Sequence, residues 1–141
     1  MSGALLLAAA LSWASEPQLP PFGPGEDGAC GEKPNCVSTL DGRPKRHALP
    51  WPYQGSQLAA QGRLERAIES FPRAAVAEIR PGYIHAVFKS ALWRFADDVE
   101  FLFPEREAVI HFRSASRTGH WDFGANRRRM KKVEEAFKAA P

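Results

Sequence analysis

The sequence predicts an α+β domain in which a four-stranded antiparallel sheet carries two helices on one face, preceded by an extended arm rich in proline and glycine. Four short segments alternate apolar and polar residues with the period of two that is typical of strands. They lie between two segments whose apolar residues recur with helical spacing. Consecutive strands with short connections usually pair antiparallel, and two helices on the apolar face of such a sheet make two layers.

The chain of 141 residues is long enough for one domain and divides into three segments. Residues 1–15 form an apolar leader, residues 16–55 form the arm, and residues 56–141 form the α+β domain. The leader's apolar run, residues 4–11, is too short to span a bilayer and precedes small residues suited to cleavage after Ala14. The leader therefore resembles a signal peptide and predicts a periplasmic or secreted protein. No Lys or Arg precedes the run, so a truncated membrane anchor and a buried apolar segment remain as alternatives.

The arm holds eight of the twelve prolines, so neither a helix nor a central strand can run through it. We expect it to lie extended over the domain, anchored by apolar contacts of Trp51 and Tyr53. An even number of cysteines in an exported chain predicts a disulfide between Cys30 and Cys36. Two free thiols are expected instead if the chain is cytosolic. A zinc site is disfavoured because the two cysteines lack the further ligands that such a site needs.

The first helix begins after Ser56, a residue type that caps helices, and ends before Pro72. Its expected apolar face is Ala60, Leu64, Ala67, Ile68 and Phe71. A strand follows at Ala75–Arg80, and Pro81-Gly82 marks the turn into a second strand at Tyr83–Lys89. The last helix places four apolar residues on one face, namely Met130, Val133, Phe137 and Ala140.

The third and fourth strands are expected to form a hairpin about the four-residue connection 104–107. The expected cross-strand pairs are Phe103–Ala108, Phe101–Ile110, Val99–Phe112, Glu100–His111 and Asp98–Arg113. One face of the hairpin is then apolar, and the other carries two pairs of complementary charge. A slip of one residue would place apolar side chains opposite charged ones, so the pattern specifies the register.

Three segments of the sequence are distinctive: CGEKPNCVSTL from Cys30, YIHAVFKSALWRFADDVEF from Tyr83, and VIHFRSASRTGHWDFGANRRRM from Val109. They resemble the hallmark segments of the DUF1499 family, a domain of unknown function. The resemblance runs from Cys30 to about Lys132, with small departures at Thr39 and at Trp93-Arg94. It implies a domain that is often exported or membrane-associated, and it implies no catalytic residues.

The polar loop between the fourth strand and the last helix is the predicted binding site. It combines arginines and hydroxyls with the backbone N–H groups of a helix start, which attract anions, and arginine adds bidentate recognition of phosphate or carboxylate. The expected ligand-binding residues are Arg113, Ser114, Ser116, Arg117, Asp122, Asn126 and Arg127. The alternative is structural: Arg113 and Arg117 pair with Asp97, Asp98 or Asp122, and Asp122 caps the helix.

The polar face of the sheet is a second candidate. If the strand that holds His85 pairs with the hairpin, then His85, Glu100 and His111 converge. Two imidazoles and a carboxylate form a ligand set for zinc or non-haem iron, and also an acid–base set. The alternative is a solvated face with cross-strand ion pairs, which are common on exposed strands.

Two other activities are disfavoured. The basic run from Arg127 to Lys132 suits nucleic acid or anionic lipid head groups, but export argues against nucleic acid, and the aromatic side chains that would stack on bases are expected in the core. Ser114 or Ser116 with His111 or His120 suits a hydrolase, but no GxSxG elbow frames them.

The sequence therefore favours a small exported domain, without cofactor or catalytic residues, that binds an anionic small molecule, a lipid head group or a protein partner. Association with a membrane surface fits the lipid case. A metal-dependent enzyme and a purely structural interaction domain are the alternatives.

Overall fold

The structure, a computed structural model, describes residues 28–92 and 95–141. The predicted leader and the first part of the arm lie outside these residues. The described chain forms six strands and two helices. In chain order they are β1 (Cys36–Ser38), β2 (Trp51–Pro52), α1 (Gln57–Glu69), β3 (Ala74–Arg80), β4 (Tyr83–Lys89), β5 (Ala96–Leu102), β6 (Val109–Ser116) and α2 (Ala125–Ala139).

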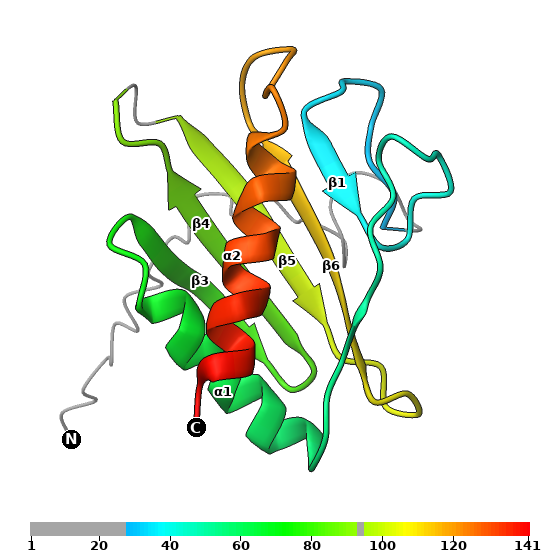
Figure 1. The fold of residues 1–141 in the computed structure, drawn as a ribbon, viewed down its shortest axis with the longest axis vertical. Helices are drawn as coiled ribbons and strands as arrows, with labels where there is room; N and C mark the ends of the chain where they lie inside the picture. Colours follow the sequence, from blue (N-terminus) through cyan, green and yellow to red (C-terminus); the bar gives the residue numbers. More distant parts are fainter. Residues whose placement is uncertain (1–27, 93–94) are drawn as a thin grey trace, which may run out of the picture.

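The strands pair antiparallel in the order β1-β6-β5-β4-β3, and β2 pairs with β6 beside β1. Both helices cover the same face of the sheet (Figure 1). The α+β class with two helices on a sheet is confirmed, but the expected number of four strands is wrong. The arm supplies the two additional strands in place of a purely extended segment. Both strands pair with β6 on the side that faces away from β5. At such an edge of the sheet, the prolines of the arm do not interrupt the hydrogen bonds between central strands.

Aromatic contacts hold the described part of the arm against the domain, and a disulfide closes a short loop within the arm. Cys30 and Cys36 form the predicted disulfide, with an S–S distance of 2.05 Å. Trp51 is 5% exposed and packs among three phenylalanine rings of the core. The ring of Tyr53 lies 6.0 Å from that of Phe103, measured between centroids. Both predicted aromatic anchors are confirmed.

The first helix begins after Ser56 as predicted, and both helices bury most of the apolar residues that the spacing predicts. Ser56 Oγ accepts a 3.1 Å hydrogen bond from the backbone N–H of Ala59, and α1 ends before Pro72. Ala140 follows the end of α2 instead of joining its apolar face. The buried helix residues that pack on the sheet are Ala60, Leu64, Ala67, Ile68, Met130, Val133 and Phe137. Burying each large side chain contributes roughly 1.5–3 kcal/mol, so this layer holds the helices in place. Within the described ranges, neither helix has the length and apolar character to cross a membrane.

The β5–β6 hairpin has a register that differs from the predicted one by two residues. Phe101 pairs with Phe112 instead of Ile110, and Glu100 pairs with Arg113 instead of His111. A shift of two residues preserves the side-chain faces because the strand period is two. The apolar face is therefore as expected, whereas both predicted charge pairs, Glu100–His111 and Asp98–Arg113, are wrong.

The alternation of the two strands does not distinguish registers that differ by two residues, because both keep the same side chains on each face. Phe103 was expected to pair with Ala108, but neither residue belongs to the β5–β6 ladder. The Phe103 N–H donates to the Gly82 carbonyl at 2.9 Å in the β3–β4 turn, and the Ala108 carbonyl accepts a 3.1 Å hydrogen bond from the N–H of Tyr53 in the arm. The connection between β5 and β6 is longer than the expected four residues. The positive φ of 79° at Gly82 suits glycine at this turn.

Candidate functional site

The loop that follows β6 turns into α2 at Gly124, the N-cap residue, and the side chain of Asp122 binds backbone N–H groups at this helix start. Its carboxylate oxygens accept hydrogen bonds from the backbone N–H groups of Gly124, at 2.9 Å, and Asn126, at 3.1 Å. Burial alone would raise the pKa of Asp122, but hydrogen bonds from Asn126 and Gly124 outweigh it and hold the pKa below its ordinary value. The helix start therefore binds a carboxylate of its own chain, as the structural alternative predicts.

Asn126, in the first turn of α2, is fully buried and ties three segments together. Its side-chain oxygen accepts hydrogen bonds from Ser114 Oγ, at 2.6 Å, and from Arg129 Nη1, at 2.9 Å. Its side-chain nitrogen donates to the Asn35 carbonyl, to Ser116 Oγ and to Asp122 Oδ2. The side chain thus joins β6, α2 and the segment that leads into β1.

Arg113 forms a buried ion pair on the sheet face that points away from the helices. Its Nε donates to Glu100 Oε2 at 3.3 Å, and the hydroxyl of Tyr83 donates to Glu100 Oε1 at 2.7 Å. Arg113 is 5% exposed and Glu100 is fully buried. Burial and the bond to Glu100 raise the pKa of the Tyr83 hydroxyl above its ordinary range. The solvated sheet face that was the alternative interpretation is therefore not found at these residues.

Arg117 pairs with Asp98 on the same face. Its Nε and Nη2 donate to the two carboxylate oxygens at 2.7 and 2.8 Å, and His85 Nε2 lies 2.8 Å from Asp98 Oδ1. Burial would raise the pKa of Asp98, but hydrogen bonds from Arg117 and His85 hold it far below its usual range. The pKa of Arg117 is raised by the same hydrogen bond. Its positive charge is consequently matched within the chain, although half of the side chain is exposed.

The structure does not bring the predicted metal set together. His85 pairs with Glu100 across the β4–β5 ladder, but His111 stands opposite Leu102. His111 Nδ1 lies 3.0 Å from Thr39 Oγ1, and burial lowers the pKa of its imidazole against the opposing effect of Glu107. Across residues 28–92 and 95–141, no group of three or more His, Cys, Asp or Glu side chains is arranged to hold a metal ion.

The serine and histidine residues of the hydrolase hypothesis have separate partners. Ser114 and Ser116 are both bonded to Asn126, and the ring of His120 packs edge-on against Trp121 at 5.0 Å between centroids. In the described chain, neither serine hydroxyl is hydrogen bonded to an imidazole.

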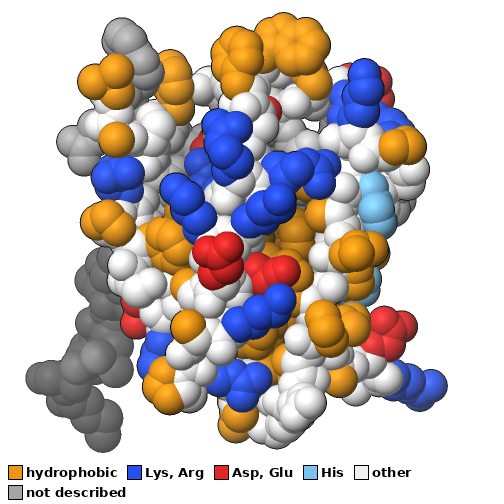
Figure 2. Space-filling view, in the orientation of Figure 1, with side chains coloured by type: hydrophobic (Ala, Val, Ile, Leu, Met, Phe, Trp, Pro, Cys, Tyr) orange, Lys and Arg blue, Asp and Glu red, His pale blue; other side chains and the backbone are white. Residues whose placement is uncertain are grey.

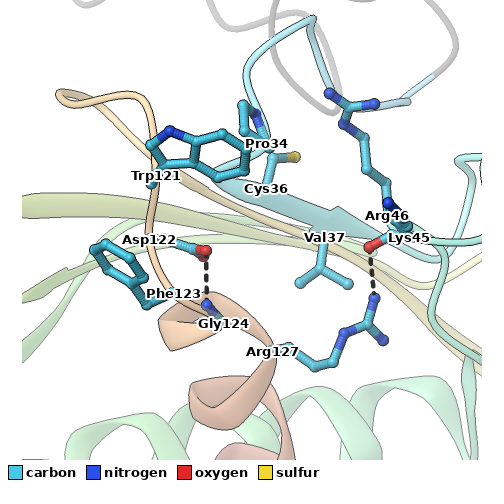
Figure 3. Close-up of a pocket in the computed structure, with 10 residues that line it drawn as sticks. All are labelled: Pro34, Cys36, Val37, Lys45, Arg46, Trp121, Asp122, Phe123, Gly124 and Arg127. Carbon is cyan, nitrogen blue, oxygen red and sulfur yellow. Dashed lines mark hydrogen bonds between the residues drawn. The ribbon is translucent and has the colours of Figure 1, made fainter.

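A hollow of about 410 Å3 lies between the arm, the loop after β6 and the start of α2 (Figure 3). Trp121 and Phe123 stand on one side of it, and Lys45 and Arg46 on the other, while Arg127 reaches across from α2 (Figure 3). Its lining residues are Pro34, Cys36, Val37, Lys45, Arg46, Trp121, Asp122, Phe123, Gly124 and Arg127. Of the seven predicted ligand residues, only Asp122 and Arg127 belong to it.

The guanidinium groups of the hollow are held by carbonyl oxygens. Arg127 donates to the carbonyls of His47 and Lys45, at 3.0 and 3.1 Å, and Arg46 Nη2 donates to the carbonyl of Glu32 at 2.5 Å. Arg46 Nε is buried and has no hydrogen-bond partner among the described residues. Carbonyls orient a guanidinium but leave its net charge in place, so the hollow is positively charged. The Asp122 carboxylate is turned to the start of α2, where the helix dipole offsets its charge.

The model of a family described as protein of unknown function, DUF1499, matches residues 28–137. The chain belongs to the DUF1499 family. The match covers the sheet, nearly all of both helices and the hollow. No curated protein matches the chain.

Eight of the ten lining residues of the hollow in this DUF1499 domain were not among the predicted ligand residues, and four of these eight are basic or large aromatic. Lys45 and Arg46 lie in the arm, and their one visible signal is the short basic run from Arg43 to Arg46. Trp121 and Phe123 belong to the predicted polar loop but were not among the proposed ligand residues, and they are 67% and 87% exposed. Aromatic side chains inside a polar loop, away from any periodic segment, were the signal for exposure.

Proposed function

We propose that this DUF1499 domain is a non-enzymatic binding module for an anionic ligand, and that the hollow beside Trp121 is its binding site. The observation that carries the proposal is a set of positive side chains without carboxylate partners. Within the described part of the chain, Lys45, Arg46 and Arg127 form no ion pair with an acidic residue. A phosphate or carboxylate would supply the missing charge.

The proposed site includes the C-terminal end of the predicted loop, next to α2. The residues at the N-terminal end of the loop have a structural role instead. Arg127 is retained as a ligand residue, and Asp122 as the residue that positions it at the helix start. Arg113 and Arg117 have carboxylate partners, and Ser114 and Ser116 both bind Asn126. Arg117 holds the loop, and the two serines with Asn126 hold α2 against β6, which pre-organises the hollow and lowers the entropic cost of binding.

We also propose that the domain works outside the cytosol, in the periplasm or as a secreted protein. The disulfide between Cys30 and Cys36 supports this location, because such bonds persist in oxidising compartments and are rare in the cytosol. The expected export signal at residues 1–15 lies outside the described residues. N-terminal sequencing of the mature protein after expression with its native leader tests the location, and an intact leader on protein retained in the cytosol would refute it.

The binding proposal is tested by titrating 15N-labelled protein with inorganic phosphate and with glycerol 3-phosphate. We expect saturable chemical shift changes at residues 34–37, 45–46 and 121–127. Lys45→Gln removes a charge from the hollow without breaking a hydrogen bond of the fold, and Arg127→Gln removes one that also holds the arm. Each substitution should weaken binding about ten-fold, the worth of one charge-assisted hydrogen bond.

Arg106→Gln is the matched control. Arg106 is exposed in the β5–β6 connection, at the opposite end of β6 from the hollow. The Arg106→Gln variant should bind both anions with the affinity of the unmodified protein. Equal affinities for Lys45→Gln, Arg127→Gln and the unmodified protein, or no saturable shifts at the hollow, would refute the proposed function.

A further inference from the structure

Two connections leave the sheet at the same end. Lys89, the last residue of β4, pairs with Ala96, and the next residue of β5, Asp97, pairs with Ser116 at the end of β6. The described residues of the β4–β5 connection and the loop after β6 therefore lie at the same end of the sheet (Figure 1). The hollow also lies at this end, because the loop after β6 forms one of its walls.

Large apolar side chains are exposed on both connections. Leu92 and Phe95 of the β4–β5 connection are 78% and 54% exposed, and Trp121 and Phe123 are 67% and 87% exposed. Single exposed apolar residues are ordinary on a protein surface, and Leu58 on α1 is one. Four at one end of a sheet, three of them aromatic, form a feature that needs an explanation. We call these four residues the apolar tip.

The backbone at Phe123 adds a second, independent observation. Its φ of 51° lies in the left-handed region, which a residue with a bulky side chain rarely adopts. A strained residue persists only where its surroundings impose it, and such residues cluster at functional sites. Here the guanidinium of Arg128 donates to the Phe123 carbonyl at 2.6 Å, so the fold holds this backbone while the ring stays in solvent.

Positive side chains border the apolar tip. Lys45, Arg46 and Arg127 line the hollow, and Arg128 lies against the loop itself. Figure 2 shows lysine and arginine side chains gathered directly below the exposed apolar groups at this end of the molecule. An apolar tip above a basic rim matches the layers of an anionic bilayer, with its apolar interior and its phosphate plane.

We propose that this end of the domain docks on the surface of a membrane that contains anionic phospholipids. The apolar tip enters the interface, where tryptophan and phenylalanine are favoured, and the basic rim meets the phosphates. One lipid phosphate occupies the hollow, so the inference rests on the proposed function of that site and names its ligand class. Both parts act together, because weak apolar insertion and surface charge each give only marginal membrane binding alone.

The test is co-sedimentation of the full chain with vesicles of phosphatidylcholine and with vesicles of phosphatidylcholine mixed with phosphatidylglycerol. We expect binding to the mixed vesicles, weakened by added salt, and little binding to phosphatidylcholine alone. The double substitution Lys45→Gln/Arg128→Gln should reduce the partition coefficient about 25-fold, since each basic residue near such a surface contributes about a five-fold effect. Trp121→Ala/Phe123→Ala should abolish sedimentation.

Two matched controls separate the docking end from the rest of the surface. Leu58→Ala removes an equally exposed apolar side chain from α1, and Arg106→Gln removes an exposed charge at the opposite end of the sheet. Both should sediment like the unmodified protein. Brominated lipids should quench the emission of Trp121, measured as the difference between the unmodified protein and Trp121→Phe. All variants carry the same leader, so differences among them report on the docking end.

Four results would overturn the inference. The first is equal binding of the unmodified protein to phosphatidylcholine vesicles and to mixed vesicles. The second is sedimentation of Trp121→Ala/Phe123→Ala with mixed vesicles at the level of the unmodified protein, and the third is no quenching of Trp121. The fourth is binding of a single-stranded oligonucleotide by a protein that does not bind vesicles. If inorganic phosphate still shifts the resonances of the hollow in these cases, only membrane docking fails. If neither phosphate nor mixed vesicles bind, the proposed function fails as well.

Discussion

Ser114 on β6 donates a 2.6 Å hydrogen bond to the side-chain oxygen of Asn126 on α2, and both side chains are completely buried. This contact connects the centre of the sheet to the first turn of the last helix. It makes a polar pair part of the core at the point where the chain turns toward the hollow, so the shape of the site depends on a hydrogen bond that no ligand touches.

Asn126→Ala should destabilise the domain by about 2–4 kcal/mol. The substitution leaves buried groups, including the Ser114 hydroxyl and the Asn35 carbonyl, without their partner, and each unsatisfied group costs roughly 1–3 kcal/mol. Urea unfolding followed by circular dichroism measures the change. Ser116→Ala, which removes a single half-buried bond to Asn126, is the control and should cost about 1 kcal/mol. Equal stabilities for the two variants would contradict the central role of Asn126.

Arg113→Met should destabilise the domain by about 3–5 kcal/mol, because it leaves the buried carboxylate of Glu100 without its cation. Glu100→Gln should also be destabilising, since it leaves a buried guanidinium uncompensated. The double variant Glu100→Gln/Arg113→Met removes both charges and should cost less than the two single changes added together. A double-mutant cycle in urea measures this coupling, and strict additivity would show that the two side chains do not interact.

Acid should destabilise the domain in part through Asp98. Because the pKa of Asp98 is lower in the folded chain than in the unfolded chain, its contribution is complete above the ordinary carboxyl pKa of about 3.9. The contribution is lost as the pH falls toward the lowered value. Urea unfolding at a series of pH values should therefore show stability falling below about pH 4. Asp98→Asn should reduce the loss of stability per pH unit in this range. An unchanged pH dependence would show that Asp98 does not contribute to the acid sensitivity.

Arg117→Ala should lower stability by no more than about 1 kcal/mol and leave phosphate binding at the hollow unchanged. The side chain is 47% exposed, and exposed ion pairs contribute little, while His85 remains beside Asp98. The two measurements are urea unfolding and the phosphate titration followed by nuclear magnetic resonance. Loss of phosphate binding in a folded Arg117→Ala protein would show that Arg117 belongs to the binding site, as the sequence alone suggested.

Reduction of the disulfide should destabilise the domain by about 2 kcal/mol, the loop-closure value for the short segment between Cys30 and Cys36. Thermal unfolding with and without a reductant measures this effect. The double variant Cys30→Ser/Cys36→Ser should match the reduced protein and should not respond to the reductant. A reductant effect on the serine variant would have to come from another cause.

Local sequence signals predicted the elements of the domain well. The cap at Ser56, the turn at Gly82 and most of the apolar face of each helix depend on residues close together in the chain, and the structure confirms them. Phe71 and Ala140 are the exceptions, since both lie beyond the ends of their helices. The hairpin register was harder, because two registers that differ by two residues place the same side chains on each face. Strands β1 and β2 were missed because their pairing partner lies far along the chain and prolines hide the strand pattern.

The candidate site was predicted only in part, for a related reason. The polar loop was identified as important, but residue types do not reveal whether an arginine meets a ligand or an aspartate of its own chain. Arg117 and Asp98 are brought together only by the pairing of β5 with β6, and Lys45 reaches the hollow only through the docking of the arm. Both facts belong to the tertiary structure.

The pairing of β1 with β6 has a consequence for biosynthesis. The carbonyl of Asn35 receives a hydrogen bond from Asn126, 91 residues later, and all three residues of β1 pair with β6. As the polypeptide leaves the ribosome or a translocation pore, β1 must therefore wait for β6 before this ladder can form, although Ser38 can bridge the nearby His47 earlier. Cys30 and Cys36 need no such wait, because only six positions separate them, so an oxidase can close their bond on the emerging chain.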